Sequence, residues 1–207
     1  ITRRAGRGIV ITMVADKDLG RARKLVGDAA EITDDAAKVV RHAEIDIVIE
    51  LIGGTNVAKD LILEAIDNGK HVVTANKALL AEHGQEMFDR ARELGRSIAF
   101  DAAVAGGIPV IKVMRESLAG NSISRVFGIL NGTCNYILTR MEQEGLSFAD
   151  CLADAQRLGY AEADPTFDIE GNDTAHKLSI LTSIAFGTQI AADDIYLEGI
   201  SNISQAD

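Results

Sequence analysis

The stretch Ile45–Lys77, IDIVIELIGGTNVAKDLILEAIDNGKHVVTANK, predicts the fold class of this chain. It opens with a β-branched run at Ile45–Ile49 and ends near a second one at His71–Val73, and such runs are typical of buried parallel strands. Between them, Asn56–Asn68 carries apolar residues at helical spacing and is followed by Gly69, a common helix stop. A strand, a helix and a strand in this order predict a βαβ unit of a largely parallel sheet.

The same alternation continues on both sides of this unit. We expect further strands at Ile9–Val14 and Ser97–Phe100, and a helix at Asn76–Leu94 with Asn76 as its N-cap. These elements predict an α/β fold around a largely parallel sheet, and a dinucleotide-binding fold of this kind would also need a glycine-rich turn. The sequence shows no glycine-rich turn between a first strand and a first helix. We therefore expect the first strand and that turn to lie upstream of Ile1 in a longer protein.

The residue pattern changes at residues 104–109, where small residues and a proline interrupt the alternation of predicted strands and helices. We expect a domain boundary there, which divides the chain into residues 1–105 and residues 106–207. The second is predicted to contain a strand at Ile123–Leu130 and helices from about residue 133 to Glu144, at Ser147–Leu158 and at Asn172–Phe186.

Composition narrows the class of function. The 207 residues carry 21 Lys and Arg against 31 Asp and Glu, a net charge of −10, with six Phe, three Tyr and no Trp. This balance supplies neither the basic surface nor the aromatic platforms that nucleic-acid binding uses. No apolar run reaches the roughly 18 residues of a membrane span. Cys134 and Cys151 lie in no metal-ligand or disulfide pattern, so we expect a cytoplasmic, reducing location.

Ligands of open parallel sheets bind beyond the carboxyl ends of the strands. Gly53 and Gly54 follow the strand at Ile45–Ile49, and their backbone is open to a ligand unless they merely form a tight turn. After the next strand, Thr74 precedes a helix start that places Lys77 in the first turn. A cation is unfavourable there, so the Lys77 side chain either turns to solvent or meets an anionic partner.

Charged residues are densest between residues 162 and 177. Asp173 and Lys177 are four residues apart and share one helix face, which suits a surface ion pair as well as a buried site. The apolar residues on this helix favour burial; they are Leu178, Ile180, Leu181 and Ile184. A lysine beside a carboxylate and apolar surface can donate or accept a proton, because burial disfavours its charged form. We expect His176 to serve in packing or hydrogen bonding.

Residues 155–177, AQRLGYAEADPTFDIEGNDTAHK, resemble the signature of the homoserine dehydrogenases. Residues 72–77 (VVTANK), 103–109 (AVAGGIP) and 128–136 (GILNGTCNY) are similar to further segments of that family, in the family's order. The resemblance covers nearly the whole chain. It implies an incomplete Rossmann-like dinucleotide-binding domain at residues 1–105, followed by an incomplete α+β substrate-binding and catalytic domain at residues 106–207. It implies NAD- or NADP-dependent interconversion of L-homoserine and L-aspartate 4-semialdehyde, a step toward threonine, methionine and isoleucine.

The resemblance also implies roles for individual residues. Lys177 matches the catalytic lysine, which would protonate the aldehyde oxygen or deprotonate the hydroxyl, with Asp173 beside it. Carboxylates suit the ammonium group of homoserine, and the resemblance assigns that task to Glu162 and Asp173. Asp168 would either assist them in binding the substrate or orient Lys177. Cofactor contacts are expected at Gly53, Gly54, Thr74, Lys77 and Gly159, with Lys77 also facing the substrate. The hydride chemistry itself belongs to the nicotinamide.

A monovalent-cation site is the third implication of the resemblance. In the family, backbone carbonyls of a loop that corresponds to Asp101–Ile108 hold sodium. The matching positions are Asp101, Val104, Gly106 and Ile108, and a glycine-rich turn without an ion is the alternative. The family also forms homodimers and higher homo-oligomers.

Some questions stay open at the level of sequence. Asp16 favours NAD, whereas Lys17 and Arg21 favour the 2′-phosphate of NADP. Other functions consistent with the sequence are a different amino-acid-linked dehydrogenase, or a truncated or inactive paralogue that binds a small molecule. The long match that includes Asp173 and Lys177 disfavours the first alternative.

Overall fold

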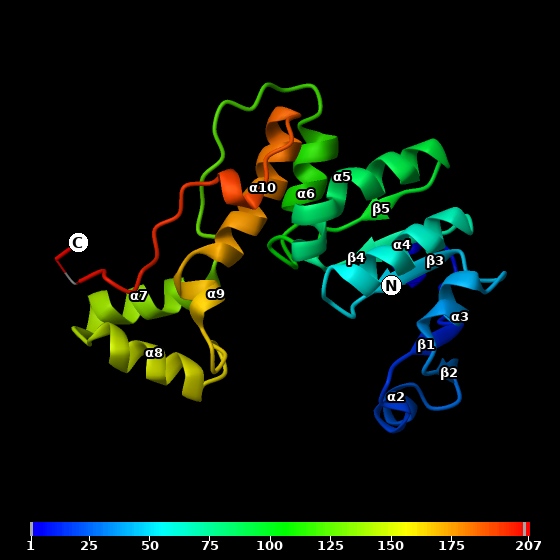
Figure 1. Ribbon diagram of the computed structural model, residues 1–207, viewed down its shortest axis with the longest axis horizontal. Coiled ribbons are helices and arrows are strands. Elements are labelled where there is room, and N and C mark those ends of the chain that lie inside the picture. Colours follow the sequence, from blue (N-terminus) through cyan, green and yellow to red (C-terminus); the bar gives the residue numbers. More distant parts are fainter. Residues whose placement is uncertain (1, 205) are drawn as a thin grey trace. The chain divides into compact units, whose positions relative to one another are not determined.

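The chain folds into two compact units in the computed structural model, which describes residues 2–204 and 206–207 (Figure 1). Unit 1 comprises the described residues up to Leu79 together with His83–Ala99. Unit 2 comprises Leu80–Glu82 and the described residues from Phe100 onward. The boundary expected after residue 105 lies a few residues beyond this division.

Unit 1 contains five short strands, and all their pairings are parallel. They are β1 (Met13–Ala15), β2 (Glu31–Thr33), β3 (Ile47–Glu50), β4 (His71–Thr74) and β5 (Ile98–Ala99). β1 pairs with β2, and the other three form one sheet in the order β3-β4-β5. In that sheet Glu50 lies opposite Thr74 at the carboxyl ends of their strands. The parallel α/β arrangement predicted from the sequence is thereby confirmed.

The helices of unit 1 include the two predicted at residues 56–68 and 76–94, and three of those that the structure describes begin with a side-chain cap. They are α1 (Thr2–Ala5), α2 (Leu19–Val26), α3 (Ala36–Arg41), α4 (Asn56–Asp67) and α5 (Lys77–Glu93). Asp18, Asp35 and Asn76 each accept a hydrogen bond from the backbone at the start of a helix. α4 packs against β3 and β4, and its Ile62 and Ile66 are fully buried.

Two details of unit 1 differ from the sequence prediction. The strand expected at Ile9–Val14 begins only at Met13, and Ile9–Ile11 is exposed, because the pairing with β2 starts at Met13. The strand β2 was not predicted. Its three residues, Glu31–Thr33, are too few to show an alternating pattern.

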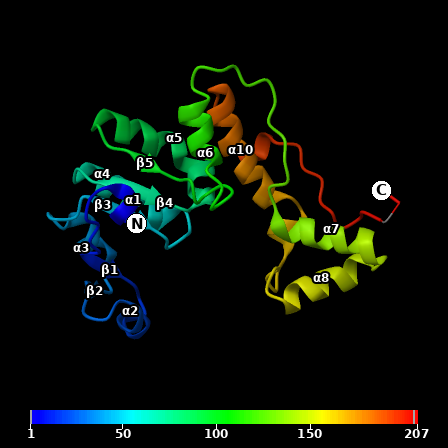
Figure 2. The ribbon, with the colours of Figure 1, turned by 180° about the vertical axis from the view of Figure 1, so that it is seen from behind.

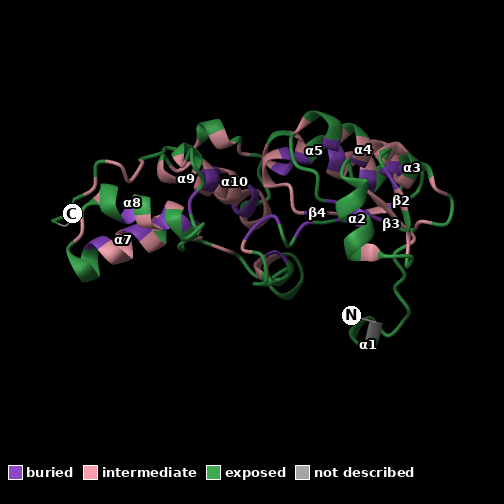
Figure 3. Ribbon diagram, turned by 90° about the horizontal axis from the view of Figure 1, so that it is seen from below, coloured by how far each residue is buried: buried purple, intermediate pink, exposed green. Residues whose placement is uncertain are grey.

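Unit 2 is helical over the residues that the structure describes. Its elements are α6 (Val110–Lys112), which continues into the π-helical turn η1 (Val113–Ser117), then α7 (Gly132–Glu144), α8 (Phe148–Arg157), α9 (Thr166–Ile169), α10 (Asn172–Phe186) and the 3₁₀ turn η2 (Ala192–Asp194). α7 and α8 lie side by side as a hairpin (Figure 2). Their facing sides are buried (Figure 3) and contribute Ile137, Met141, Cys151 and Ala155 to one apolar core.

The strand predicted at Ile123–Leu130 is wrong: this segment is irregular in the structure, and the described part of unit 2 has no strand. The β-branched pattern is present, but no neighbouring segment supplies the backbone hydrogen bonds of a ladder. Phe127 is accordingly 87% exposed and Ile129 is 78% exposed. No helix among the described residues is long and apolar enough to cross a membrane.

Candidate active site

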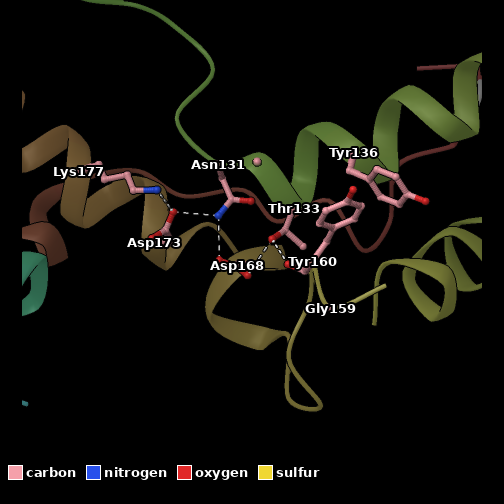
Figure 4. Close-up of a pocket in the computed structure, with 9 residues that line it drawn as sticks. Asn131, Thr133, Tyr136, Gly159, Tyr160, Asp168, Asp173 and Lys177 are labelled. Carbon is pink, nitrogen blue, oxygen red and sulfur yellow. Dashed lines mark hydrogen bonds and ion pairs between the residues drawn. The ribbon is translucent and has the colours of Figure 1, made fainter. Parts of the chain in front are cut away.

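A cavity of about 580 Å³ opens in unit 2 where α7, α9 and α10 begin (Figure 4). The turn after α8 completes its wall. The residues around it are Asn131, Gly132, Thr133, Tyr136, Gly159, Tyr160, Asp168, Asp173 and Lys177. Segments far apart in the sequence thus place polar and charged side chains around one space.

The Lys177 ammonium and the Asp173 carboxylate form a largely buried ion pair at this cavity. Lys177 Nζ lies 2.6 Å from Asp173 Oδ2 and donates a second hydrogen bond, at 2.8 Å, to the carbonyl oxygen of Leu130. Asp173 is 2% exposed, and the Lys177 side chain is 18% exposed. The pair is therefore not the exposed surface pair that the spacing alone would also allow. Removing either partner of a buried pair leaves an uncompensated charge.

A second carboxylate, Asp168, is joined to Asp173 through the side-chain amide of Asn131. The Asn131 Nδ2 group donates to Asp168 Oδ1 and to Asp173 Oδ2, both at 2.8 Å. Asn131 Oδ1 accepts a hydrogen bond from the backbone N–H of Cys134 at 2.8 Å, which makes Asn131 the N-cap of α7. One side chain thus starts a helix and bridges two carboxylates.

The opposite wall of the cavity is formed by Thr133 and two tyrosines. The Thr133 hydroxyl lies 2.8 Å from the carbonyl oxygen of Tyr160 and 3.2 Å from Asp168 Oδ2. The rings of Tyr136 and Tyr160 pack at 4.9 Å between centroids. Arg140 donates to the Tyr136 hydroxyl at 2.9 Å, and this contact holds the ring against the wall.

The acidic character of the cavity also affects the thiol of Cys134. Burial, and then the negative charges of Asp168 and Asp173, raise the pKa of Cys134 to about 11. The Cys134 Sγ group lies 3.3 Å from the carbonyl oxygen of Asp168 and donates to it. The thiol therefore stays protonated near neutral pH and is not suited to act as a nucleophile there.

In unit 1, the ends of β3 and β4 are tied together by a buried carboxylate. Glu50 Oε1 accepts hydrogen bonds from the backbone N–H groups of Ile52 at 2.8 Å and Gly53 at 3.0 Å. Glu50 Oε2 accepts a hydrogen bond from the Thr74 hydroxyl at 2.6 Å. Asn76 Nδ2 donates to the carbonyl oxygen of Gly54 at 2.7 Å, which adds a second link between the two turns.

The backbone at this sheet edge fits a ligand that approaches it closely. Gly53 and Gly54 have φ of +73° and +72°, and no heavy atom beyond each glycine and its two chain neighbours lies within 4 Å of a Cβ position built on it. The space above both glycines is therefore open, as contact with a nucleotide requires. Thr74, by contrast, is 0% exposed, so its hydroxyl supports the turn through Glu50.

Comparison with known proteins decides the family. Residues 1–101 match the family model described as the homoserine dehydrogenase NAD binding domain, and residues 109–207 match the model described as homoserine dehydrogenase. The chain belongs to the homoserine dehydrogenase family. A homoserine dehydrogenase of Pseudomonas aeruginosa is 56% identical over 207 residues, which are all of this chain and 47% of that protein. One of Corynebacterium glutamicum is 49% identical over 208 residues, or 46% of its length.

Solved structures of the family agree with this assignment. The crystal structure of a homoserine dehydrogenase from Thiobacillus denitrificans matches with a TM-score of 0.94 and 53% identity, over 100% of this chain and 48% of that one. A hyperthermophilic archaeal homoserine dehydrogenase in complex with NADPH matches with a TM-score of 0.78 and 28% identity, over 93% and 62% of the two chains. The chain spans about half the length of the curated relatives it matches.

Only some of the site residues expected from the homoserine dehydrogenase signature lie at the cavity. Gly159, Asp168, Asp173 and Lys177 line it, whereas Glu162 is exposed on the loop after α8 and is not among the lining residues. Lys77 lies in the first turn of α5, in unit 1, and is half-buried. His176 packs edge-on against Phe167 at 5.3 Å between ring centroids, which is the packing role expected of it.

The loop expected to hold sodium in the homoserine dehydrogenase fold is sharply curved. Ala105 and Gly107 have φ of +53° and +87°, and the carbonyl oxygen of Ile108 accepts a hydrogen bond from Val110 at 2.8 Å. Asp101 Oδ1 accepts a hydrogen bond from the backbone of Lys112 at 3.2 Å. Among the described residues no group of three His, Cys, Asp or Glu side chains could hold a metal, but the expected ligands are carbonyls. Sodium binding at Asp101, Val104, Gly106 and Ile108 stays a prediction.

The sequence prediction missed Asn131 and Thr133. The residues Asn-Gly-Thr before an amphipathic helix do indicate an N-cap. Their contacts with Asp168 and Asp173 span 35 to 42 positions in the chain, and no local pattern could show them.

Proposed function

We propose that this chain carries the substrate site, and part of the nucleotide site, of an NAD- or NADP-dependent homoserine dehydrogenase. The activity interconverts L-homoserine and L-aspartate 4-semialdehyde, small molecules of amino-acid biosynthesis. The observation that carries the proposal is the buried Lys177–Asp173 pair, 2.6 Å apart, at a cavity with a second carboxylate. Family membership supports the same reaction.

Lys177 is the residue suited to move the proton. In the oxidation of homoserine, the O–H bond of the hydroxyl breaks and its proton passes to the Lys177 amine, while the carbon that bears the hydroxyl loses a hydride from its C–H bond and its C–O bond becomes C=O. In the reverse direction, the Lys177 ammonium protonates the aldehyde oxygen. Lys177 Nζ is held by two hydrogen bonds, to Asp173 Oδ2 at 2.6 Å and to the carbonyl oxygen of Leu130 at 2.8 Å. The third N–H of the ammonium can then donate to a substrate oxygen. A nicotinamide cofactor, when bound, supplies the hydride acceptor or donor.

The carboxylates are suited to bind the ammonium group of the substrate. Asp168 is half-buried at the cavity, and a charge-assisted hydrogen bond to an ammonium is stronger than a neutral one. Asp173 adds negative charge beside it. Glu162 remains a proposed partner on the basis of its place in the family signature.

The cofactor residues of this chain belong to the same proposal. We assign the nucleotide contacts to Gly53, Gly54, Thr74, Lys77 and Gly159. The open backbone at Gly53 and Gly54 and the match to an NAD binding domain support the first two. The archaeal relative solved with NADPH supports a nicotinamide nucleotide. The relative rates of homoserine oxidation with NAD⁺ and with NADP⁺ decide between the two nucleotides.

Three further features follow from the family. We propose sodium on the carbonyls of Asp101, Val104, Gly106 and Ile108, a homodimer or higher homo-oligomer, and a cytoplasmic location. The curved backbone of the 101–108 loop supports the first. Light scattering of the purified protein tests the second.

The test of the function is homoserine-dependent reduction of NAD⁺ and NADP⁺ at alkaline pH. It is run on the complete protein and on its Lys177→Ala variant. Lys59→Ala is the control, because Lys59 forms a surface pair with Glu86 at 3.1 Å. Turnover that is lost in Lys177→Ala and kept in Lys59→Ala supports the proposal. Folded protein that turns over homoserine with neither nucleotide would favour an inactive, small-molecule-binding paralogue, and turnover of another amino acid would favour a different dehydrogenase.

A further inference from the structure

Asn131 lies within the site, but neither the family signature nor the proposed reaction assigns it a role. Both N–H donors of its side-chain amide are used, on Asp168 and Asp173, and its oxygen accepts from the backbone N–H of Cys134. It is 7% exposed. A buried amide whose two donors and acceptor oxygen are all engaged is held in one geometry.

We propose that Asn131 is the positioning residue of this site: its amide bridges Asp168 and Asp173 and thereby sets the spacing and the orientation of the two carboxylates. The inference rests on the proposed function for its effect on turnover. Asn131 need not touch the reacting atoms, because it acts through the carboxylates that do.

The contacts allow the amide only one orientation. With the nitrogen toward the carboxylates, both of its protons point at acceptors and the oxygen faces a backbone N–H. Flipped by 180°, the oxygen would face two carboxylates and the NH₂ group would face the Cys134 N–H. Every contact would then be repulsive, so the assignment follows from the network itself.

The Asn131 bridge also offsets the repulsion between the two negatively charged carboxylates. Asp168 and Asp173 accept from the same nitrogen, so two negative charges lie close together, with the single positive charge of Lys177 on the Asp173 side. A neutral amide can donate to both without adding charge, which no carboxylate, hydroxyl or ammonium at position 131 can do. The bridge thereby holds the Asp173 carboxylate beside the Lys177 ammonium, and it holds the Asp168 carboxylate on the second N–H of the same amide.

Asn131→Asp is the sharpest variant to test this. The two side chains have nearly the same shape, and a carboxylate still caps α7 by accepting from Cys134. Only the two donors are lost, and a third negative charge is added. Asn135→Asp is the matched control, because it adds the same charge one turn along α7 at an exposed position. Asn131→Ser keeps a helix cap but is too short to reach both carboxylates.

We expect kcat for homoserine oxidation in the complete protein to fall about 10- to 100-fold in Asn131→Asp, with a smaller change in KM. Homoserine oxidation needs a Lys177 amine that can accept the proton, so its rate is expected to rise with pH. This rise should lie at higher pH in Asn131→Asp, because the added charge joins Asp168 and Asp173 around Lys177, with the protonated Cys134 thiol nearby. Asn131→Ser should lose activity without that pH shift. Asn135→Asp should stay within about twofold of the wild type. A kcat of Asn131→Asp within twofold of the wild type would overturn the inference.

Thermal unfolding gives a readout that does not need activity. The new carboxyl group would be destabilised as an anion by Asp168 and Asp173, so the loss of Tm should be large at pH 7 and shrink as the pH falls and that group is protonated. Asn135→Asp should show no such dependence. An equal loss of Tm in both variants, or one that does not change with pH, refutes the bridge. If the wild type proves inactive while the pH-dependent loss is seen, the bridge stands and the proposed function fails.

Discussion

The carboxylate of Glu50 accepts a hydrogen bond from the Thr74 hydroxyl at 2.6 Å, between residues that are register partners at the carboxyl ends of β3 and β4. Glu50 is 6% exposed, and Thr74 has no exposed surface. Since Glu50 also accepts from Ile52 and Gly53, this contact connects the glycine turn to the neighbouring strand. The shape of the proposed nucleotide edge thus depends on a buried carboxylate.

Thr74→Val is therefore expected to destabilise the protein. The substitution keeps the shape but leaves a buried carboxylate oxygen without its donor, which costs about 1–3 kcal/mol of the free energy of unfolding. Urea unfolding of the complete protein measures this. Thr33→Val is the control, since the Thr33 hydroxyl only accepts from the backbone of Asp35 at 3.1 Å, and its loss should be smaller. Equal losses in the two variants would mean that Glu50 does not depend on Thr74.

Asp173→Asn should abolish most of the turnover. The Lys177 ammonium would keep its burial but lose its counter-charge, and the amide would place an N–H group beside it or beside Asn131. We expect kcat to fall at least about tenfold. Glu116→Gln is the matched control, because Glu116 pairs with Lys112 across the same four-residue spacing on an exposed surface, at 2.5 Å. Near-wild-type activity of Asp173→Asn would remove Asp173 from the site.

The sequence was most informative where the pattern was local. The βαβ unit at Ile45–Lys77 was predicted with nearly correct bounds, because buried strands and an amphipathic helix each produce a regular apolar pattern among neighbouring residues. α10 was predicted residue for residue, since apolar positions and Gly187 define both its face and its end. The spacing of Asp173 and Lys177 likewise indicated a shared helix face.

The parts that were missed depend on tertiary contacts. Ile123–Leu130 has the composition of a strand but pairs with no strand among the residues that the structure describes, and composition alone cannot show a pairing. Glu50 would be read as the polar end of a strand, whereas the structure buries it on the amides of the next turn. Asn131 stood out only as part of the similar segment at residues 128–136, because the carboxylates that it bridges come from α9 and α10.

Acid should weaken the α7–α8 hairpin through Asp154. Hydrogen bonds from Arg157 and then Arg140 hold the pKa of Asp154 below its ordinary value. A carboxylate with a lowered pKa in the folded state stabilises the protein above its unfolded pKa, about 4, and this contribution is lost as the pH falls through the folded pKa. Asp154→Asn should therefore lower Tm at pH 6 and have little effect at pH 2–3.

Thermal unfolding followed by circular dichroism measures the pH dependence of Asp154→Asn. Asp193→Asn, on the 3₁₀ turn η2, controls for the removal of one carboxylate elsewhere in the protein. A Tm difference between wild type and Asp154→Asn that stays constant from pH 6 to pH 3 would contradict the role of the two arginines.

Cys134 should resist alkylation although it stands beside the cavity. Its pKa is raised to about 11, first by burial and then by Asp168 and Asp173, and only the thiolate reacts. In a Cys151→Ser background, which leaves Cys134 as the only thiol among these 207 residues, we expect iodoacetamide to label Cys134 of the native protein at pH 7.5 far more slowly than in guanidinium chloride. Mass spectrometry after timed quenching gives both rates. Asp168→Asn should speed labelling of the native protein modestly, because it removes the second cause of the raised pKa and leaves the first in place. Native labelling as fast as in the denatured chain would show that the thiol is neither buried nor beside the two carboxylates.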